Sequence, residues 1–270
     1  MISIENAELN YIAQNTNMEI SNVSFARLDT EWRYDDAVSN STRVYIPTLG
    51  EGILESRNEK VSIVPGKIYI IPSMLNFSYR CENRLEKFFV HVSIEKLGGF
   101  DVLRGVNKIL VLEDQGECEK FRQIFNEAGI EAALKMKLMV FSIIMRGISE
   151  YKISLGKPEE CSPLTRYAIE YIGKHLSAKL KVSEIADALF VSRLTLSNTF
   201  SRDMKISIGK YIDERLMLVG EQELMSGNLT INEISEKLGF CDRFYFTRKF
   251  TEKFGKAPKQ YVKANKYLLT

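Results

Sequence analysis

The charged side chains of this 270-residue chain are unevenly distributed along the sequence, and their distribution is its first indication of function. Residues 1–161 hold 19 Lys and Arg against 23 Asp and Glu, a net charge of −4. Residues 162–270 hold 18 against 12, a net charge of +6. A basic segment that follows a weakly acidic one indicates two separate roles, one of them near a polyanion.

Residue types suited to covalent or metal catalysis are few and scattered. The four cysteines include no Cys-x-x-Cys pair, and His91 is the only histidine before residue 162. A catalytic metal needs about three protein ligands, which one histidine without a neighbouring ligand set cannot supply. We therefore expect no catalytic residues, no metal, no cofactor and no enzymatic activity.

Composition and hydropathy limit the class of protein further. The 45% hydrophobic and 27% charged residues exclude a disordered or collagen-like chain, and the length predicts roughly two domains. The first ten residues lack the basic and apolar run of a secretory signal. The most apolar window, Leu138–Met145, is far shorter than the ~20 residues of a membrane span. We expect a cytoplasmic protein with reduced cysteines and no membrane partner.

Short strands are predicted in the first third of the chain. Segments rich in Val, Ile, Tyr and Phe alternate with turns such as Pro65-Gly66, a pattern that is typical of a small sandwich or barrel. The predicted strands are Arg43–Ile46, Gly52–Glu55, Lys60–Val64, Lys67–Ile71, Phe77–Arg80 and Phe88–Ile94.

Two helices are predicted to follow, over about residues 116–151. Apolar residues recur there every three or four positions, at Ile130, Leu134, Leu138, Phe141, Met145 and Ile148. This stripe could pack on the chain's own strands or on a second subunit, and these helices are our candidate for a homodimer contact. Residues 1–155 form the predicted N-terminal domain, and residues 156–162, which include a Gly and a Pro, form the predicted linker.

The basic half contains an internal repeat. Leu180–Leu189 resembles Leu229–Leu238, and after a short turn Phe200 corresponds to Phe250. Each copy has an apolar-faced short helix, a tight turn and a residue able to begin a second helix, which are the parts of a helix-turn-helix. In such a motif the second helix enters the major groove of DNA.

The two predicted motifs span about residues 181–202 and 230–254, and their second helices begin at Ser192 and Asp242. Between the motifs, Ile208–Ser226 is predicted to be one helix. Its length is about 28 Å at 1.5 Å per residue, close to the ~34 Å of one DNA turn.

A longer pattern runs from Leu238 to Tyr261. It contains a Gly-Phe turn, a Tyr-Phe pair, Phe-x-x-x-Phe-Gly and Pro-x-x-Tyr. On this pattern, residues 163–265 resemble the DNA-binding domain of the AraC/XylS family of transcription regulators. Positions that depart from the family pattern are Val262 and Leu216, where Arg is common, and Ser235, where Ala is usual.

The resemblance implies roles for side chains of the two recognition helices. Arg suits guanine, Asn suits adenine, and apolar side chains suit thymine methyl groups. The implied base contacts are Leu194, Ser197, Asn198, Arg243, Phe244, Thr247 and Arg248. The implied phosphate contacts are Arg193, Lys210, Lys249 and Lys253. The alternative is that Arg243 pairs with a neighbouring acid and Phe244 belongs to the core.

A second resemblance covers residues 18–94. The Pro-Gly-x-x-x-x-x-Pro run within Val64–Ser73 is similar to the strand pair of cupin-like sensor domains, with Asn76 where a His is common. Phe89 and His91 share one face of their predicted strand. If that face lines the barrel, an aromatic effector pocket would consist of Tyr45, Phe77, Tyr79, Phe89 and His91. Otherwise these residues are ordinary packing.

The expected architecture is an α+β chain with two domains, a small cupin-like β-barrel with helices and an all-α tandem helix-turn-helix domain over residues 163–270. The resemblance implies a sequence-specific regulator that binds double-stranded DNA and RNA polymerase. We expect an activator, controlled by a small effector or a partner at the barrel. Two alternatives remain open: a cupin-type enzyme with a basic appendage, and an N-terminal domain that only oligomerises or docks a protein.

Overall fold

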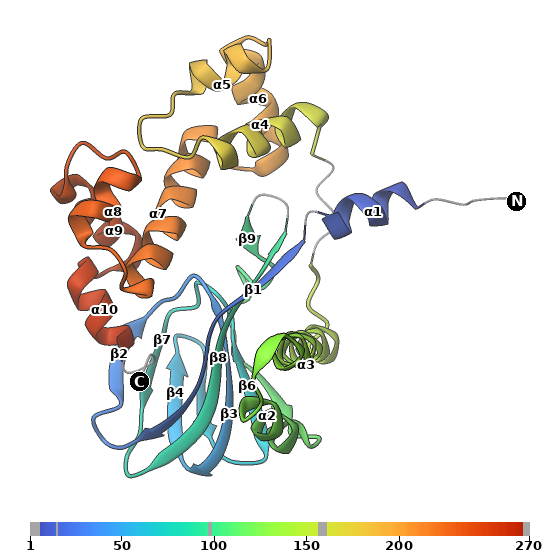
Figure 1. Ribbon diagram of the computed structural model, residues 1–270, viewed down its shortest axis with the longest axis vertical. Helices are drawn as coiled ribbons and strands as arrows, with labels where there is room; N and C mark the ends of the chain where they lie inside the picture. Colours follow the sequence, from blue (N-terminus) through green and yellow to red (C-terminus); the bar gives the residue numbers. More distant parts are fainter. Residues whose placement is uncertain (1–5, 15, 97–98, 156–160, 267–270) are drawn as a thin grey trace, which may run out of the picture. The chain divides into compact units, whose positions relative to one another are not determined.

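A computed structural model describes residues 6–14, 16–96, 99–155 and 161–266 (Figure 1). The chain divides into two compact units, one comprising Met1–Leu155 with Ala264–Thr270 and the other comprising Gly156–Lys263. Most of the predicted linker, residues 156–160, lies outside the described residues.

The N-terminal unit consists of short strands preceded and followed by helices. The helices are α1 (Ala7–Gln14), α2 (Glu117–Phe125) and α3 (Gly129–Glu150). The strands are β1 (Asn17–Leu28), β2 (Arg33–Ala37), β3 (Thr42–Gly50), β4 (Gly52–Ser56), β5 (Lys60–Ile63), β6 (Lys67–Ile71), β7 (Phe77–Arg80), β8 (Leu85–Lys96), β9 (Phe100–Asp101) and β10 (Leu110–Glu113). The six predicted strands correspond to β3–β8. The long β1 was not predicted, because its polar residues alternate with half-buried ones and give a weak apolar signal.

The strands form two separate antiparallel sheets. The larger sheet has the order β1-β8-β3-β6-β10, with β9 paired to β8, and the smaller has the order β2-β7-β4-β5. No pair of described strands joins the sheets, so the predicted small sandwich or barrel is observed as a double-sheet sandwich that is not closed. Two-sheet jelly rolls, the cupin arrangement, hold their sheets together through interior side chains rather than through a continuous ladder.

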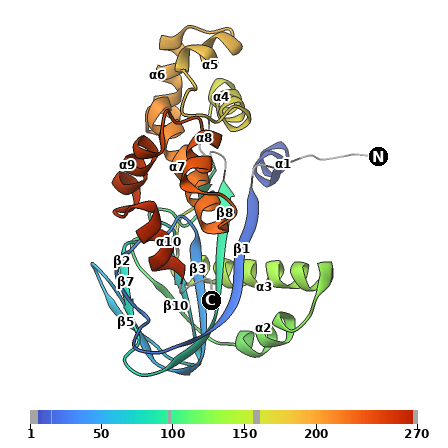
Figure 2. The same cartoon turned by 60° about the vertical axis from the view of Figure 1, so that its left-hand side comes forward.

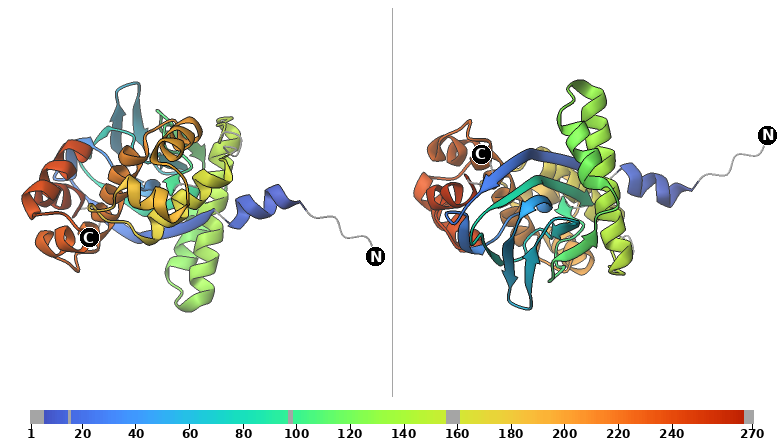
Figure 3. Two further views of the ribbon diagram at one scale, coloured as in Figure 1. Left: turned by 90° about the horizontal axis from the view of Figure 1, so that it is seen from above. Right: turned by 90° about the horizontal axis from the view of Figure 1, so that it is seen from below.

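The outer face of the larger sheet is covered by α2 and α3 (Figures 2 and 3). Val90 and Val92 of β8 belong to the same buried apolar cluster as Val140 of α3. Gly147 allows α3 to lie close to the sheet, because a Cβ there would be 2.7 Å from Ile70 Cδ1. This packing buries one apolar face of α3, and the opposite face of the helix is exposed to solvent.

The second core lies between the two sheets. It combines Tyr45, Tyr69 and Phe89 of the larger sheet with Leu54 and Tyr79 of the smaller one, all of them buried. Because side chains alternate along a strand, the residues of β8 divide between the two cores. The face that carries Phe89 and His91 is the one toward the interior of the sandwich.

The C-terminal unit is entirely helical over its described residues. Its helices are α4 (Pro163–Lys174), α5 (Val182–Ala188), α6 (Arg193–Met204), α7 (Ile208–Ser226), α8 (Ile231–Lys237), α9 (Arg243–Phe254) and α10 (Pro258–Lys266). The predicted tandem motifs and the predicted spacer helix are confirmed.

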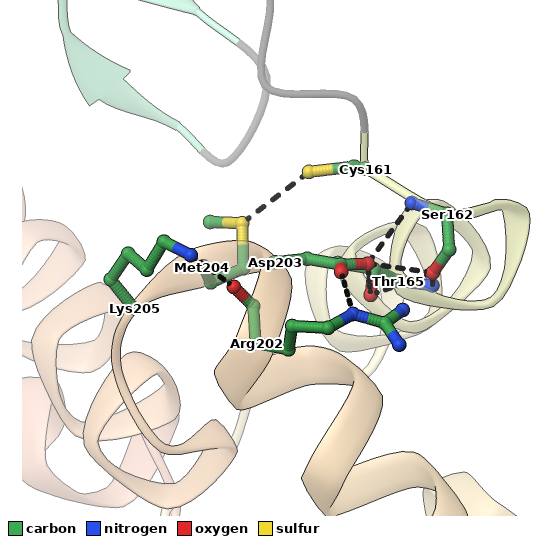
Figure 4. Close-up of polar contacts among 7 residues, drawn as sticks. All are labelled: Cys161, Ser162, Thr165, Arg202, Asp203, Met204 and Lys205. Carbon is green, nitrogen blue, oxygen red and sulfur yellow. Dashed lines mark hydrogen bonds and ion pairs between the residues drawn. The ribbon is translucent and has the colours of Figure 1, made fainter.

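A hydrogen-bonded cluster at Asp203 ties the start of α4 to the end of α6 (Figure 4). The Asp203 carboxylate accepts hydrogen bonds from the Ser162 amide (3.0 Å), the Ser162 hydroxyl (2.6 Å) and the Thr165 hydroxyl (2.7 Å). Burial alone would raise the pKa of Asp203, but these hydrogen bonds outweigh it and hold the pKa below its usual range. An ionised Asp203 therefore stabilises the contact between α4 and the first motif.

Candidate DNA-binding interface

The first helix-turn-helix consists of α5 and α6. Ile185 of α5 and Leu196 and Phe200 of α6 are fully buried, so the two helices share one apolar contact. Ser192 begins α6, and its hydroxyl accepts a hydrogen bond from the Thr195 amide at 3.0 Å. The predicted N-cap is confirmed, and it fixes where the exposed first turn of α6 begins.

The second helix-turn-helix consists of α8 and α9 and repeats this design. Ile234, Phe246 and Phe250 are fully buried. The Asp242 carboxylate accepts hydrogen bonds from the amides of Tyr245 (2.8 Å) and Phe244 (2.7 Å), which lower the pKa of Asp242. Its charge also suits the positive end of the helix dipole, so α9 has the more strongly capped N-terminus.

The helix α7 joins the two motifs over the predicted range. Gly220 brings α7 close to α9, because a Cβ there would lie 2.9 Å from Phe246 Cε2. Leu216 is 1% exposed, which explains the departure from the Arg that is common at this position. Ser235 is also buried, in keeping with the small residue that the motif requires. These contacts make α7 a rigid spacer.

The side chains predicted to contact bases lie on the exposed parts of α6 and α9. Leu194 is 70% and Phe244 is 71% exposed, so neither belongs to the core. Among the described residues no carboxylate forms an ion pair with Arg243 or Arg248; instead their guanidinium groups lie 4.9 Å from the ring centroids of Phe244 and Tyr245. The alternative of a core Phe244 and an acid-paired Arg243 is therefore wrong.

The remaining predicted base contacts differ in exposure. Asn198 and Arg248 are exposed, whereas Ser197 and Thr247 are half-buried at the edge of each helix. Exposed apolar side chains beside unpaired guanidinium groups form a surface that can read thymine methyl groups and guanine edges.

The predicted phosphate contacts divide into two kinds. Arg193 and Lys210 are exposed. The Lys249 ammonium lies 2.9 Å from an Asp213 carboxylate oxygen, and this hydrogen bond raises the pKa of Lys249. Lys253 lies 4.0 Å from Glu214. Two of the four cations are thus already paired with acidic side chains of α7, which lowers the charge that they present to a phosphate.

The five predicted effector residues lie together in the interior of the N-terminal sandwich. Tyr45, Phe77, Tyr79 and Phe89 belong to one buried cluster, and the rings of Phe89 and His91 are 5.6 Å apart. Two further polar residues of this interior were not predicted from the sequence, Arg43 and Lys87. Their signal was available, because both alternate in phase with inward-facing aromatic residues on their strands.

The described residues contain no group of three or more His, Cys, Asp or Glu side chains placed to hold a metal ion. They also contain no helix that is long and apolar enough to span a membrane.

Comparison with known proteins identifies the C-terminal helices. Residues 185–264 match a family described as a helix-turn-helix domain. The Msm operon regulatory protein of Streptococcus mutans serotype c is 20% identical over 262 residues, covering 92% of this chain and 94% of that protein. The xylose operon regulatory protein of Escherichia coli (strain K12) is 30% identical over 103 residues, which are 38% of this chain and 26% of that protein. The C-terminal unit thus contains an AraC-type helix-turn-helix domain, as the sequence predicts.

The fold of the chain also has a full-length counterpart among solved structures. ToxT from Vibrio cholerae superposes with a TM-score of 0.55 at 11% identity, covering 90% of this chain and 98% of ToxT. An unsaturated fatty acid bound form of wild-type ToxT gives a TM-score of 0.54 at 12% identity, over 89% and 94% of the two chains. At these identities the likeness concerns the fold alone.

Proposed function

We propose that this chain is an AraC-family transcription regulator that recognises a specific double-stranded DNA site by inserting α6 and α9 into successive major grooves. One observation carries the proposal: α6 and α9 are both capped helices with exposed first turns. These turns present apolar side chains and arginines without an ion-pair partner among the described residues, and α7 separates the two helices. The proposed base contacts are Leu194, Ser197, Asn198, Arg243, Phe244, Thr247 and Arg248, and the proposed phosphate contacts are Arg193, Lys210, Lys249 and Lys253.

The direction of regulation that we propose is activation through RNA polymerase, in the cytoplasm. Activation rests on analogy with the family. The relatives are named as regulators of operons, which supports transcription control rather than catalysis as the activity of this chain. We accordingly propose that the chain is not an enzyme.

Genome-wide footprinting followed by binding measurements on the recovered site tests the DNA proposal. Arg243→Ala is expected to weaken specific binding by ~1–3 kcal/mol and to relax preference at one base pair. Lys174→Ala is the matched control, because Lys174 is a cation of α4 that pairs with Glu170 and lies outside both motifs. Unchanged affinity and preference in Arg243→Ala would contradict the assignment of α9.

We further propose that the regulator is a homodimer joined through α3. The face of α3 opposite its buried side carries five exposed apolar residues, and they are Ile130, Leu134, Leu138, Phe141 and Met145. Ile130 is 81% and Leu138 is 68% exposed. The spacing of four, three and four positions from Leu134 to Met145 is that of a coiled-coil seam, which a second α3 would cover.

The mass of the full chain in solution tests this dimer. The wild-type chain is expected to have twice the monomer mass by light scattering, and Leu138→Glu is expected to shift it to the monomer mass, because a buried carboxylate in the seam lacks a partner. Gln123→Glu is the control, since it adds the same charge to an exposed position of α2. A wild-type monomer at high concentration would contradict the proposal.

The N-terminal sandwich is proposed to bind a small effector that changes how the tandem motifs engage DNA. Tyr45, Phe77, Tyr79, Phe89 and His91 all lie on the interior face of the sandwich, which is the arrangement that this proposal requires. Relatives support small-molecule control as well: one is named for the xylose operon, and ToxT has been solved with an unsaturated fatty acid. The alternative, an N-terminal unit that only oligomerises or docks a protein, predicts DNA binding that no small molecule alters.

A further inference from the structure

Three basic side chains lie in the interior of the N-terminal sandwich. Lys87 is 0%, Arg43 is 1% and His91 is 6% exposed. Arg43 on β3 lies directly opposite His91 on β8 in the antiparallel register, and Lys87 lies on the same face of β8 as His91. Opposite side chains on neighbouring strands are about 5 Å apart, so Arg43 and His91 are neighbours. Lys87 is four residues along β8 from His91, and both lie beside the ring of Phe89, which is 5.8 Å from the Lys87 ammonium and 5.6 Å from the His91 ring.

Aromatic rings surround this cluster of three basic side chains. The Lys87 ammonium lies 3.0 Å from the ring centroid of Tyr45 and 4.3 Å from that of Trp32. The Arg43 guanidinium lies 5.3 Å from the centroid of the Phe77 ring. Ring faces are negative, so they reduce the cost of burying the cations, but they supply no counter-charge.

Several polar atoms of this interior have no hydrogen-bond partner among the described residues. They include Lys87 Nζ, His91 Nε2, Trp32 Nε1 and the Tyr45 hydroxyl. Trp32 Nε1 and a protonated Lys87 ammonium only donate hydrogen bonds, His91 Nε2 donates when the imidazole is protonated, and the Tyr45 hydroxyl can donate or accept. This excess of unsatisfied donors is complementary to a group that brings acceptors with it.

The buried acid of this unit, Asp101, is bound by groups that lie outside the cluster. The Asp101 carboxylate accepts hydrogen bonds from the hydroxyls of Thr42 (3.0 Å) and Ser73 (3.1 Å) and from the amides of Ile94 (3.0 Å) and Leu103 (2.9 Å). No described carboxylate forms an ion pair with Lys87 or His91. Burial, and then the charge of Arg43, lower the pKa of Lys87, and the same two causes lower the pKa of His91.

We propose that Arg43, Lys87 and His91 bind the anionic group of a small organic effector, a carboxylate or a phosphate, whose body lies against the aromatic rings of the interior. A bound anion accepts hydrogen bonds from the unsatisfied donors and stabilises the protonated forms of Lys87 and His91. The inference rests on the proposed function of the N-terminal unit as a sensor, and it gives that sensor a ligand class.

Trp32 provides the readout, because it is the only tryptophan of the chain and lies beside Lys87. The experiment follows thermal unfolding of the full chain by Trp32 fluorescence, at constant ionic strength, with two matched pairs of probes. Phenylacetate is compared with phenylacetamide, and glucose 6-phosphate with glucose. At a hundredfold excess over its Kd, a bound acid is expected to raise Tm by about 5–10 °C, whereas its uncharged counterpart has no saturable effect.

The variant Lys87→Met distinguishes an anion site from general stabilisation. It is expected to fold with an equal or higher Tm, because an apolar side chain replaces a buried cation, and to lose the acid-dependent shift. Lys60→Met, an exposed position on β5, is expected to keep the shift. Lys87→Arg retains the charge and is expected to keep at least part of the shift, and Lys87→Leu serves in place of Lys87→Met if that variant does not fold.

The result that would overturn the inference is the absence of a saturable shift with either acid, or a shift that survives in Lys87→Met. A shift with phenylacetate alone assigns a carboxylate, and one with glucose 6-phosphate alone assigns a phosphate. DNA binding is measured separately on the same proteins. A saturable acid shift without any change in DNA affinity would support the anion site and contradict the proposed sensor function.

Discussion

The two helix-turn-helix motifs share a scaffold and differ at the turn and on the exposed surface of the second helix. In both motifs the residue after the first helix has a left-handed backbone: Phe190, with φ of 55°, and Gly239, with φ of 76°. Phe190 is 96% exposed. Gly239 packs against the segment before α5, since a Cβ there would lie 2.2 Å from Ser177 Oγ. The first turn is free at the surface, whereas the second turn helps to hold the two motifs together.

The recognition helices differ in chemistry as well. The first turns of α6 and α9 both present a large exposed apolar residue, Leu194 and Phe244. Both helices begin with an exposed arginine, Arg193 in α6 and Arg243 in α9, but the exposed position five residues further on is Asn198 in α6 and Arg248 in α9. The exposed surface of α9 thus carries one more guanidinium group where α6 has an amide, and each of the differences between the two helices can be tested separately.

The difference between the turns predicts the largest effect. Gly239→Ala is expected to destabilise the C-terminal unit by about 2–3 kcal/mol, because the left-handed backbone costs an alanine about 1–2 kcal/mol and the methyl group collides with Ser177. Phe190→Ala is expected to change stability by less than about 0.5 kcal/mol, since it keeps the backbone strain and removes only an exposed side chain. Far-UV circular dichroism in a denaturant titration measures both.

Adding Ser177→Ala to the Gly239→Ala variant separates the cost of the collision from the cost of the left-handed backbone. Removing Ser177 Oγ is expected to restore the part of the loss that comes from the collision and to leave the part that comes from the backbone. Equal costs for Gly239→Ala and Phe190→Ala would show that the two turns are equivalent, which contradicts the comparison.

The difference between the exposed surfaces of α6 and α9 predicts effects on DNA rather than on stability. Arg243→Ala is expected to lose preference at a guanine, and Asn198→Ala is expected to lose preference at an adenine, each by ~1–3 kcal/mol. Only the arginine variant removes a charge, so only that variant is expected to change the salt dependence of binding if the guanidinium lies near phosphates. Binding to a library of sites at two salt concentrations measures both. Loss of preference at the same base pair in both variants would contradict a division of labour between α6 and α9.

Most of the C-terminal unit could be predicted from the sequence, because the residues that determine its helices act locally. Caps such as Ser192 and Asp242, and the left-handed Gly239, act within a few residues and repeat in two copies. The interior of the N-terminal unit depends on strand register instead. That Lys87 shares a face with His91 follows from alternation along one strand, but that Arg43 lies opposite His91 follows only once β3 and β8 are paired. The choice between a sandwich and a barrel depends on the same kind of non-local pairing, which is why the sequence left it open.

The two N-caps predict the smallest effect, which is a difference in response to acid. Ser192 does not titrate, so the N-terminus of α6 is expected to be equally stable as the pH falls, and Ser192→Ala is expected to cost ~1 kcal/mol at every pH. Hydrogen bonds lower the pKa of Asp242 in the folded chain. Its contribution is therefore present above the unfolded-state pKa of about 3.9 and is lost as the pH falls toward its lower folded value.

Hydrogen exchange of the first-turn amides of α6 and α9 between about pH 4.5 and pH 2.5 measures this difference. Both measurements use the Asp203→Asn background, because Asp203 also has a lowered pKa and would add its own loss of stability in the same pH range. Protection is expected to fall with acid in α9 and to stay constant in α6, and Asp242→Asn is expected to make the two helices alike, since Asn caps without titrating. A parallel loss of protection in both helices would show that acid acts on the whole unit rather than on the cap of α9.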